Sequence, residues 1–253
     1  MSKKCKSCGG PVKDYPSKKV VNPNYCPYCC DKKGELKSYR DIIDMMIDYL
    51  EDEHDEIRAK DRANTARKWL RKNPAWKEKY VGEDVVIENI RENNFKDIPA
   101  MSDKHDCQKC MYYQSEKGTK KNKKNWFMKM RKKYGNVGKV LYFKGEPVGF
   151  SQFAPKKEFK KLEELKKGST KTDAWYISCI AIKNEFRGNG LGNILLKSVI
   201  DDLKKRNIRK IHACGKVKGD ASHFSSGYWS MYKKLGFYQI GGDEDYIVGE
   251  KKL

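Results

Sequence analysis

A glycine-rich turn in the last third of the chain has the residue types that bind a phosphate group. Residues 187–192 read Arg-Gly-Asn-Gly-Leu-Gly, between an apolar run over 174–182 and an amphipathic stretch over 191–206. A strand, a glycine turn and a helix in this order point backbone N–H groups at an anion, because a helix N-terminus carries unpaired donors and partial positive charge. The spacing matches neither the dinucleotide fingerprint nor the P-loop. It predicts an anion-binding turn, and a turn that merely caps a helix is the alternative.

Four cysteines near the amino terminus have the spacing of zinc ligands. Cys5 and Cys8 form one C-x2-C pair, Cys26 and Cys29 form a second, and seventeen residues separate the pairs. Two such pairs supply four thiolates to a tetrahedral ion. A unit of about 38 residues with little apolar periodicity needs a staple, and metal is preferred over disulfides in a reducing compartment. We therefore predict structural zinc, with Cys30 as a bystander, because four cysteines leave no position for a catalytic water.

The formal net charge of +21 raises the question of a nucleic-acid partner. Only ten of the 55 basic residues are arginine, and arginine is the side chain suited to reading phosphates and bases. The basic run over 117–133 includes Trp126, Phe127 and Met128 at helical spacing, which indicates a face directed to a core. A lysine-rich composition is the interpretation we favour, and nucleic acid or an acidic protein remains the alternative.

The elements that must position these residues follow from periodicity. Apolar residues at helical spacing predict a helix over 39–57, and a second over 61–71 that ends at Asn73-Pro74. Strands are expected over 84–90 and 174–182 and as a hairpin of 137–143 with 146–153; a short helix is expected over 162–165. No apolar run approaches the ~20 residues of a membrane span, and no signal peptide is evident, so we expect a cytoplasmic protein without a membrane partner.

Together these segments resemble the GNAT superfamily of N-acetyltransferases. The resemblance lies in the turn at 187–192, the preceding strand 175–182, a strand over 210–214, and Met-Tyr-Lys-Lys-Leu-Gly-Phe over 231–237. It implies an α+β fold, in which flanking helices and a mixed, mostly antiparallel sheet form three layers. Here that fold follows a small zinc ribbon and a helical linker. We expect the domains to span 1–38 (zinc ribbon), 39–80 (linker) and 81–253 (acetyltransferase).

The resemblance also implies the cosubstrate, acetyl-CoA, and the residues that hold it. The two central strands of the family diverge, and the pantetheine arm pairs with the open strand edge, which corresponds to Ile180, Ala181 and Ile182. The pyrophosphate lies on backbone N–H groups of the glycine turn. Tyr232 matches the tyrosine that protonates the leaving thiolate, and a buried tyrosine bonded to a backbone carbonyl is the alternative. The turn residues concerned are Arg187, Gly188, Asn189, Gly190, Leu191 and Gly192.

The base is not identified by the resemblance. Many members place a glutamate near the start of the fourth strand, where this chain has Tyr176 and Ser178. Nearness in sequence alone makes candidates of Asp173, His223, Glu244 and Asp245; a water chain or an amine of low pKa are alternatives. Cys179 and Cys214 are expected to pack within strands, and His212 to be structural.

A further similarity, to a GNAT subgroup of undefined substrate, rests on three segments. Cys107 to Tyr113 contains a C-x2-C followed by Met-Tyr-Tyr, and Gly-Glu-Pro-Val-Gly and Ala-Pro occupy 145–149 and 154–155. Cys107 and Cys110 are buried or pocket-wall residues in the interpretation we favour, and a reversible disulfide or a metal site with His105 are alternatives.

The expected function is transfer of acetyl from acetyl-CoA to an amine of an unidentified acceptor by direct attack in a ternary complex. The alternative is a CoA-binding regulatory or adaptor module whose zinc unit recruits nucleic acid or protein. The sequence does not choose between a spacer and a homodimer contact for residues 39–80, and it does not identify the acceptor.

Overall fold

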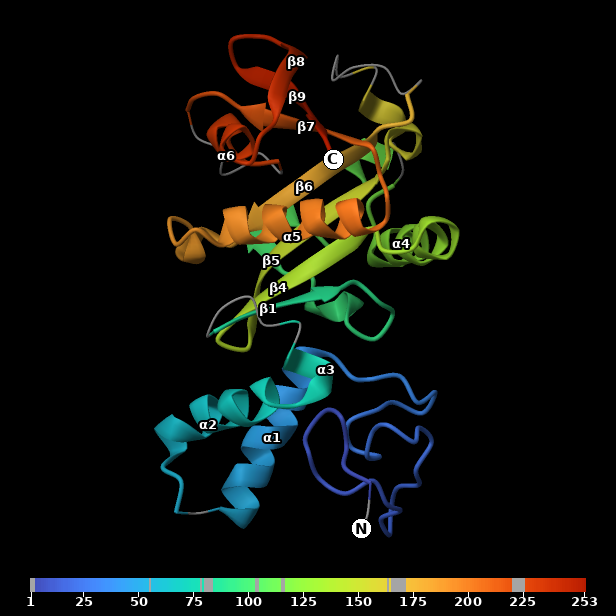
Figure 1. The fold of residues 1–253 in the computed structure, drawn as a ribbon, viewed down its shortest axis with the longest axis vertical. Coiled ribbons are helices and arrows are strands. Elements are labelled where there is room, and N and C mark those ends of the chain that lie inside the picture. Colours follow the sequence, from blue (N-terminus) through green and yellow to red (C-terminus); the bar gives the residue numbers. More distant parts are fainter. Residues whose placement is uncertain are drawn as a thin grey trace. The chain divides into compact units, whose positions relative to one another are not determined.

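The computed structural model describes residues 3–54, 56–77, 79, 84–102, 105–114, 117–162, 164, 172–219 and 226–253. The chain divides into two compact units (Figure 1). The first comprises residues 1–88 with 142–147, and the second comprises 89–141 with 148–253. Each unit is described by itself. No helix in these described ranges is long and apolar enough to cross a membrane.

The first unit begins with a segment that has no regular element. Over 3–38 the backbone makes isolated bridges, such as Lys4 with Pro11 and Cys30 with Leu36. Helix α1 (Tyr39–Glu53) follows, and the Ser38 hydroxyl caps it by accepting the Asp41 N–H at 3.1 Å. The helix ends four residues before the predicted 57, at His54. Its last turn carries Glu51, Asp52 and Glu53 and no basic residue, and negative charge is unfavourable at a helix C-terminus.

Two more helices and an aromatic cluster complete this unit. Helix α2 (Ala59–Arg71) covers the second predicted helix, and the short α3 (Pro74–Lys77) was not predicted. Pro74 begins α3 because proline suits the first helical turn, where its missing N–H is not needed. Trp76 is fully buried, and its indole N–H donates to Ser7 Oγ at 3.1 Å. The ring of Tyr39 lies 5.2 Å from that of Trp76 and 5.5 Å from that of Tyr142, both edge to face.

The sheet confirms the predicted fold class. Its strand order is β1-β4-β5-β6-β7-β9-β8. β5 and β6, β7 and β9, and β8 and β9 are antiparallel pairs, whereas β6 and β7 are parallel. A separate two-stranded sheet pairs β2 (Ala100–Ser102) with β3 (His105–Asp106). The seven strands are β1 (Val85–Asn89), β4 (Gly138–Phe143), β5 (Glu146–Pro155), β6 (Trp175–Ile182), β7 (Lys210–Lys216), β8 (Tyr238–Gly242) and β9 (Tyr246–Lys252).

Helices of the second unit cover both faces of this sheet. The Phe127 side chain of α4 (Lys120–Tyr134) lies where a Cβ on Gly138 would be. The next residue, Lys139, pairs with Asp202 of α5 (Leu191–Lys205) at 2.9 Å. Successive strand residues point to opposite faces, so α4 and α5 lie on opposite sides of β4. Figure 1 shows α5 crossing the strands on one face. The third helix, α6 (Trp229–Lys234), packs closely on β7 at Gly215.

The central strands and α5 match their predicted ranges closely, and the hairpin turn is Lys144-Gly145, both at positive φ. The buried Trp126 and Phe127 confirm that the basic segment over 117–133 directs a face to the core. Of the short helix expected over 162–165, residues 163 and 165 lie outside the described residues, and a 3-10 turn (Lys160–Leu162) precedes them. The hairpin of β8 and β9 was not predicted, because Gly241, Gly242 and the acidic turn at 243–245 weaken a strand pattern.

Candidate functional site

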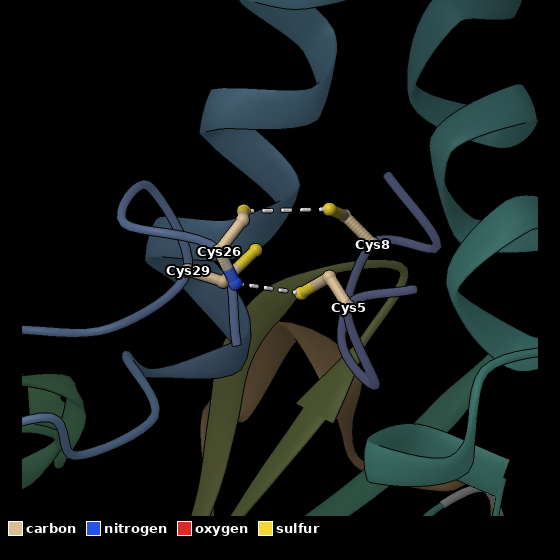
Figure 2. Close-up of side chains that lie close together, drawn as sticks. All are labelled: Cys5, Cys8, Cys26 and Cys29. Carbon is tan, nitrogen blue, oxygen red and sulfur yellow. Dashed lines mark hydrogen bonds between the residues drawn. The ribbon is translucent and has the colours of Figure 1, made fainter. Parts of the chain in front are cut away.

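The four predicted zinc ligands come together in the first unit. The thiol sulfurs of Cys5, Cys8, Cys26 and Cys29 all lie within 4.8 Å of one another, and Figure 2 shows the two pairs facing each other. The sulfurs of Cys8 and Cys26 are 3.7 Å apart, and the Cys26 N–H donates to the Cys5 sulfur at 3.2 Å. Local turns position each pair, since Gly9 N–H donates to the Cys5 carbonyl at 2.9 Å and Cys29 N–H to that of Cys26 at 2.9 Å.

The electrostatics of this cluster fit a divalent cation. Hydrogen bonds from the Cys26 and Cys29 thiols lower the pKa of Cys5, because they stabilise its thiolate. The neighbouring Cys26 and Cys5 in turn raise the pKa of Cys29. Four thiols this close cannot all ionise without a positive charge between them, and a zinc ion supplies that charge. The donor set is therefore that of a closed structural zinc site.

Cys30 is also buried, and its thiol lies 3.6 Å from the Cys26 carbonyl oxygen, to which it donates. It does not belong to the group of four sulfurs. Among the described residues, no other set of three or more histidine, cysteine and carboxylate side chains gathers closely enough to hold a metal. Cys107 is half-buried and Cys110 is exposed, and both are free thiols.

In the second unit, the glycine turn presents open backbone donors. Gly188 and Gly190 have φ of +81° and +74°, and a Cβ on either would have no heavy atom within 4 Å. The N–H groups of residues 188–193 find no acceptor within the described part of the chain, and Gly190 begins α5 without a side-chain cap. The Arg187 guanidinium braces the turn by donating to the Ile182 carbonyl at 3.0 Å. The turn is thus an exposed row of N–H groups at a helix N-terminus, which is an arrangement suited to a phosphate.

Beside this turn the two central strands separate. β6 pairs with β7 at Trp175, Tyr176 and Ile177, and the described ladder has no further pair, although both strands continue. On its other side β6 remains paired with β5, where Ile180 lies opposite Ser151 and Ile182 opposite Gly149. Residues 180–182 therefore form a strand edge without a ladder partner on the β7 side. The edge leads directly into the turn.

Tyr232 lies on α6 and is fully buried. Its hydroxyl donates to the Ser226 carbonyl at 2.6 Å. Burial, with the neighbouring Cys214 and Tyr113, raises the pKa of Tyr232 well above its usual value, so the phenol keeps its proton at neutral pH. A second buried phenol, that of Tyr176, has no hydrogen-bond partner among the described residues.

The structure places the described base candidates on the surface. Asp173 is exposed and pairs with Lys210 at 2.8 Å, and the hydrogen bond from Lys210 lowers the pKa of Asp173. Glu244 and Asp245 lie in the exposed turn between β8 and β9. His223 lies outside the described residues. His212 is buried, with Lys156 Nζ 3.2 Å from Nδ1 and Glu250 2.8 Å from Nε2, which agrees with its expected structural role.

Lys123, Gln152 and Ser178 form a buried polar group that sequence reasoning missed. All three are almost fully buried in the second unit. Lys123 lies among eight lysines and arginines over 120–133, so its charge gives no signal that it faces inward. The spacing from Lys123 to the buried Phe127 and Met130 is a helical one, and it is the only sign in the sequence.

The family of acetyltransferases described as the GNAT family matches residues 100–237, more than half of the chain. A putative zinc ribbon domain matches residues 4–77. No curated protein matches the sequence.

Three solved structures illustrate the similarity of the fold. An N-acetyltransferase from Staphylococcus aureus Mu50 is 18% identical, covering 67% of this chain and 98% of its own, with a TM-score of 0.47. A ribosomal-protein-alanine N-acetyltransferase from Brucella melitensis is 18% identical, covering 66% and 99%, with a TM-score of 0.46. Naa50 from Arabidopsis thaliana, in complex with a bisubstrate analogue, is 17% identical, covering 67% and 99%, with a TM-score of 0.43.

Proposed function

Because this chain belongs to the GNAT family of acetyltransferases, we propose that it transfers the acetyl group of acetyl-CoA to an amine by direct attack in a ternary complex. The observation that carries the proposal is the open row of N–H groups over 188–193, next to a strand edge that has no ladder partner. The first feature suits a pyrophosphate and the second suits an extended chain of amides. Acetyl-CoA contains both, joined to a thioester.

We assign the donor to backbone groups. The N–H groups from Arg187 to Gly192 hold the pyrophosphate, and Ile180, Ala181 and Ile182 pair with the pantetheine amides. Glycine at 188 and 190 supports this assignment, since the positive φ at both positions is strained for other residues. The side chains at 180–182 are buried, so recognition of the arm depends on the backbone.

The chemical step needs one bond formed, one broken and one proton moved. The amine nitrogen attacks the thioester carbonyl carbon, the carbon–sulfur bond breaks, and the thiolate leaves. We assign Tyr232 as the acid that protonates this thiolate. Its raised pKa supports the role, because the phenol is protonated at neutral pH, and its hydrogen bond to Ser226 fixes the hydroxyl. The amine loses its proton to a group that we leave unassigned.

The zinc unit is proposed to act as a structural domain. Its four cysteines fill the coordination sphere of one zinc ion, so no position is left for an activated water. The domain limits of 1–38, 39–80 and 81–253 are part of the proposal. The acceptor is an amine of a small molecule or a protein.

Isothermal titration with acetyl-CoA and release of free thiol over a panel of amines test the proposal. We expect saturable binding and turnover with at least one amine. Absence of acetyl-CoA binding at tens of micromolar would contradict the assignment of the turn. Binding without turnover on any amine would favour the adaptor module, and a salt-dependent affinity for RNA or DNA would then identify nucleic acid as its partner.

A further inference from the structure

Lys123 is a fully buried amine in the second unit. It lies in the first turn of α4, with its Nζ 5.5 Å from the centre of the Phe127 ring and 5.7 Å from that of Phe150. It has no carboxylate partner within 4 Å in the ranges that the structure describes. Burial lowers the pKa of Lys123, because a charge is poorly solvated there.

The contacts of Lys123 are oriented neutral groups. Its amine donates to the Cys110 carbonyl at 2.5 Å and to the side-chain oxygen of Gln152. Cys110 ends a tight turn whose Lys109 and Cys110 N–H groups both donate to the Asp106 carbonyl, at 3.0 and 3.1 Å. Lys123 therefore joins the C-x2-C turn to strand β5.

From Gln152 the hydrogen bonds continue toward Tyr232. The Gln152 amide donates to Ser178 Oγ at 2.9 Å, and that hydroxyl donates to the Gln152 carbonyl at 3.2 Å. Ser178 is the first residue of β6 beyond the ladder with β7. Its carbonyl accepts the Ser226 hydroxyl at 3.4 Å, and the Ser226 carbonyl accepts the hydroxyl of Tyr232. One chain of contacts thus runs from α4, across the strand gap, to α6.

A comparison with Lys139 shows that this arrangement costs stability. Lys139 is also buried, but its amine pairs with Asp202 at 2.9 Å and with Asn89 Oδ1 at 2.8 Å. A charge buried with a partner is compensated, whereas one buried among neutral groups is not. An apolar side chain of similar length at 123 would fill the same space without that cost. The amine at 123 therefore does something that packing does not require.

We propose that Lys123 is a positioning residue for acetyl transfer, which holds the Cys107–Cys110 turn on β5 and, through Gln152, Ser178 and Ser226, fixes the hydroxyl of Tyr232 beside the strand gap. The proposal rests on the proposed function for its catalytic consequence. The contacts that it describes are independent of turnover.

Hydrogen–deuterium exchange tests the contacts without an assay of activity. In Lys123→Met we expect faster exchange in peptides that cover 107–114 and 226–237. Lys139→Met is the matched control, since it also removes a buried amine but leaves this chain of contacts intact, and its exchange in those two peptides should equal that of the wild type. Wild-type exchange over 226–237 in Lys123→Met would overturn the proposal.

Kinetics then test the consequence. For the best amine of the panel, Lys123→Met should lower kcat about tenfold or more, because small displacements of a reacting group are costly. Its acetyl-CoA Kd should stay within about twofold of the wild type, because the turn at 187–192 is unaffected. An unchanged kcat would overturn the positioning role. If the wild type itself acetylates no amine, the proposed function fails, and the exchange experiment still decides whether Lys123 fixes Tyr232.

A double-mutant cycle separates a connected chain from independent effects. Lys123→Met and Ser178→Ala remove two links of the same chain, so the double variant should be about as slow as the slower single variant. Additive losses in kcat would show that Lys123 and Ser178 act separately, and would overturn the proposal.

Discussion

Residues 3–38 and the seven-stranded sheet are held together by different kinds of residue. The described part of 3–38 contains isolated bridges in place of helices and strands, and four of its most buried side chains are cysteines. The sheet buries large aromatic side chains, among them Phe150, Phe153 and Tyr176. A small segment cannot bury enough apolar surface and depends on a staple, whereas a larger domain depends on its core. The two regions should therefore respond to different perturbations.

Removal of zinc should give the largest effect and should be confined to the cysteine region. With Cys5→Ser and Cys8→Ser together, we expect zinc to fall from ~1 ion per chain to none and residues 3–38 to lose their order, since apparent zinc binding is worth about 10–16 kcal/mol in zinc-finger peptides. Metal analysis and limited proteolysis measure this. Acetyl-CoA affinity should persist. Cys30→Ser is the control and should keep its metal; loss of zinc there would mean that our ligand set is wrong.

Substitution of Tyr232 tests the other region. Tyr232→Phe should lower kcat about a hundredfold, because a general acid contributes on the order of 10²–10⁴ in rate. It should leave the zinc content unchanged and destabilise the fold by only about 1 kcal/mol, for the lost hydrogen bond to Ser226. Steady-state kinetics and thermal melts make the comparison. A kcat within twofold of the wild type would leave Tyr232 a structural residue.

The glycine turn offers a smaller and more local test. Gly190→Val should weaken acetyl-CoA binding about tenfold or more, because a β-branched residue is strained at a φ of +74° and the N–H groups would shift. Calorimetric titration measures the Kd. Gly135→Val is the matched control, since Gly135 has a φ of +78° at the end of α4, where no donor site is proposed. Equal losses of affinity in the two variants would argue against the turn.

The smallest effect is expected for His212. Burial lowers its pKa, although the hydrogen bond to Glu250 raises it in part. A lowered pKa in the fold means that the unfolded chain binds more protons just below its own pKa of about 6.5. The stability contributed by neutral His212 is therefore complete above that pH and is lost as the pH falls through the folded pKa. Acid also weakens zinc binding, so the relevant quantity is a difference between two proteins.

That difference is the melting temperature of the wild type minus that of His212→Gln, measured at pH 5.5 and pH 7.5. We expect it to be larger at pH 7.5, because glutamine does not titrate. A difference independent of pH would show that His212 ionises equally in the folded and unfolded chains.

Local patterns predicted much of this molecule. The limits of β6 and α5 and the grouping of four cysteine sulfurs agree with sequence reasoning, because period, glycine turns and C-x2-C pairs act over a few residues. Helix α1 ended early, because acidic residues at its last turn outweigh the apolar period. The pair β8 and β9 was missed, because β9 is stabilised by β7, which is distant in sequence.

The sequence by itself determined the donor chemistry and the metal: a glycine turn between strand and helix, and two cysteine pairs, have their meaning in short spacings. Only the tertiary structure decided which groups surround the strand gap. Lys123 and Lys139 are both lysines within basic or mixed stretches, yet one is buried against a carbonyl and an amide and the other against Asp202. Such contacts join residues tens of positions apart, and the free energy of a buried charge depends on those partners rather than on its neighbours in the chain.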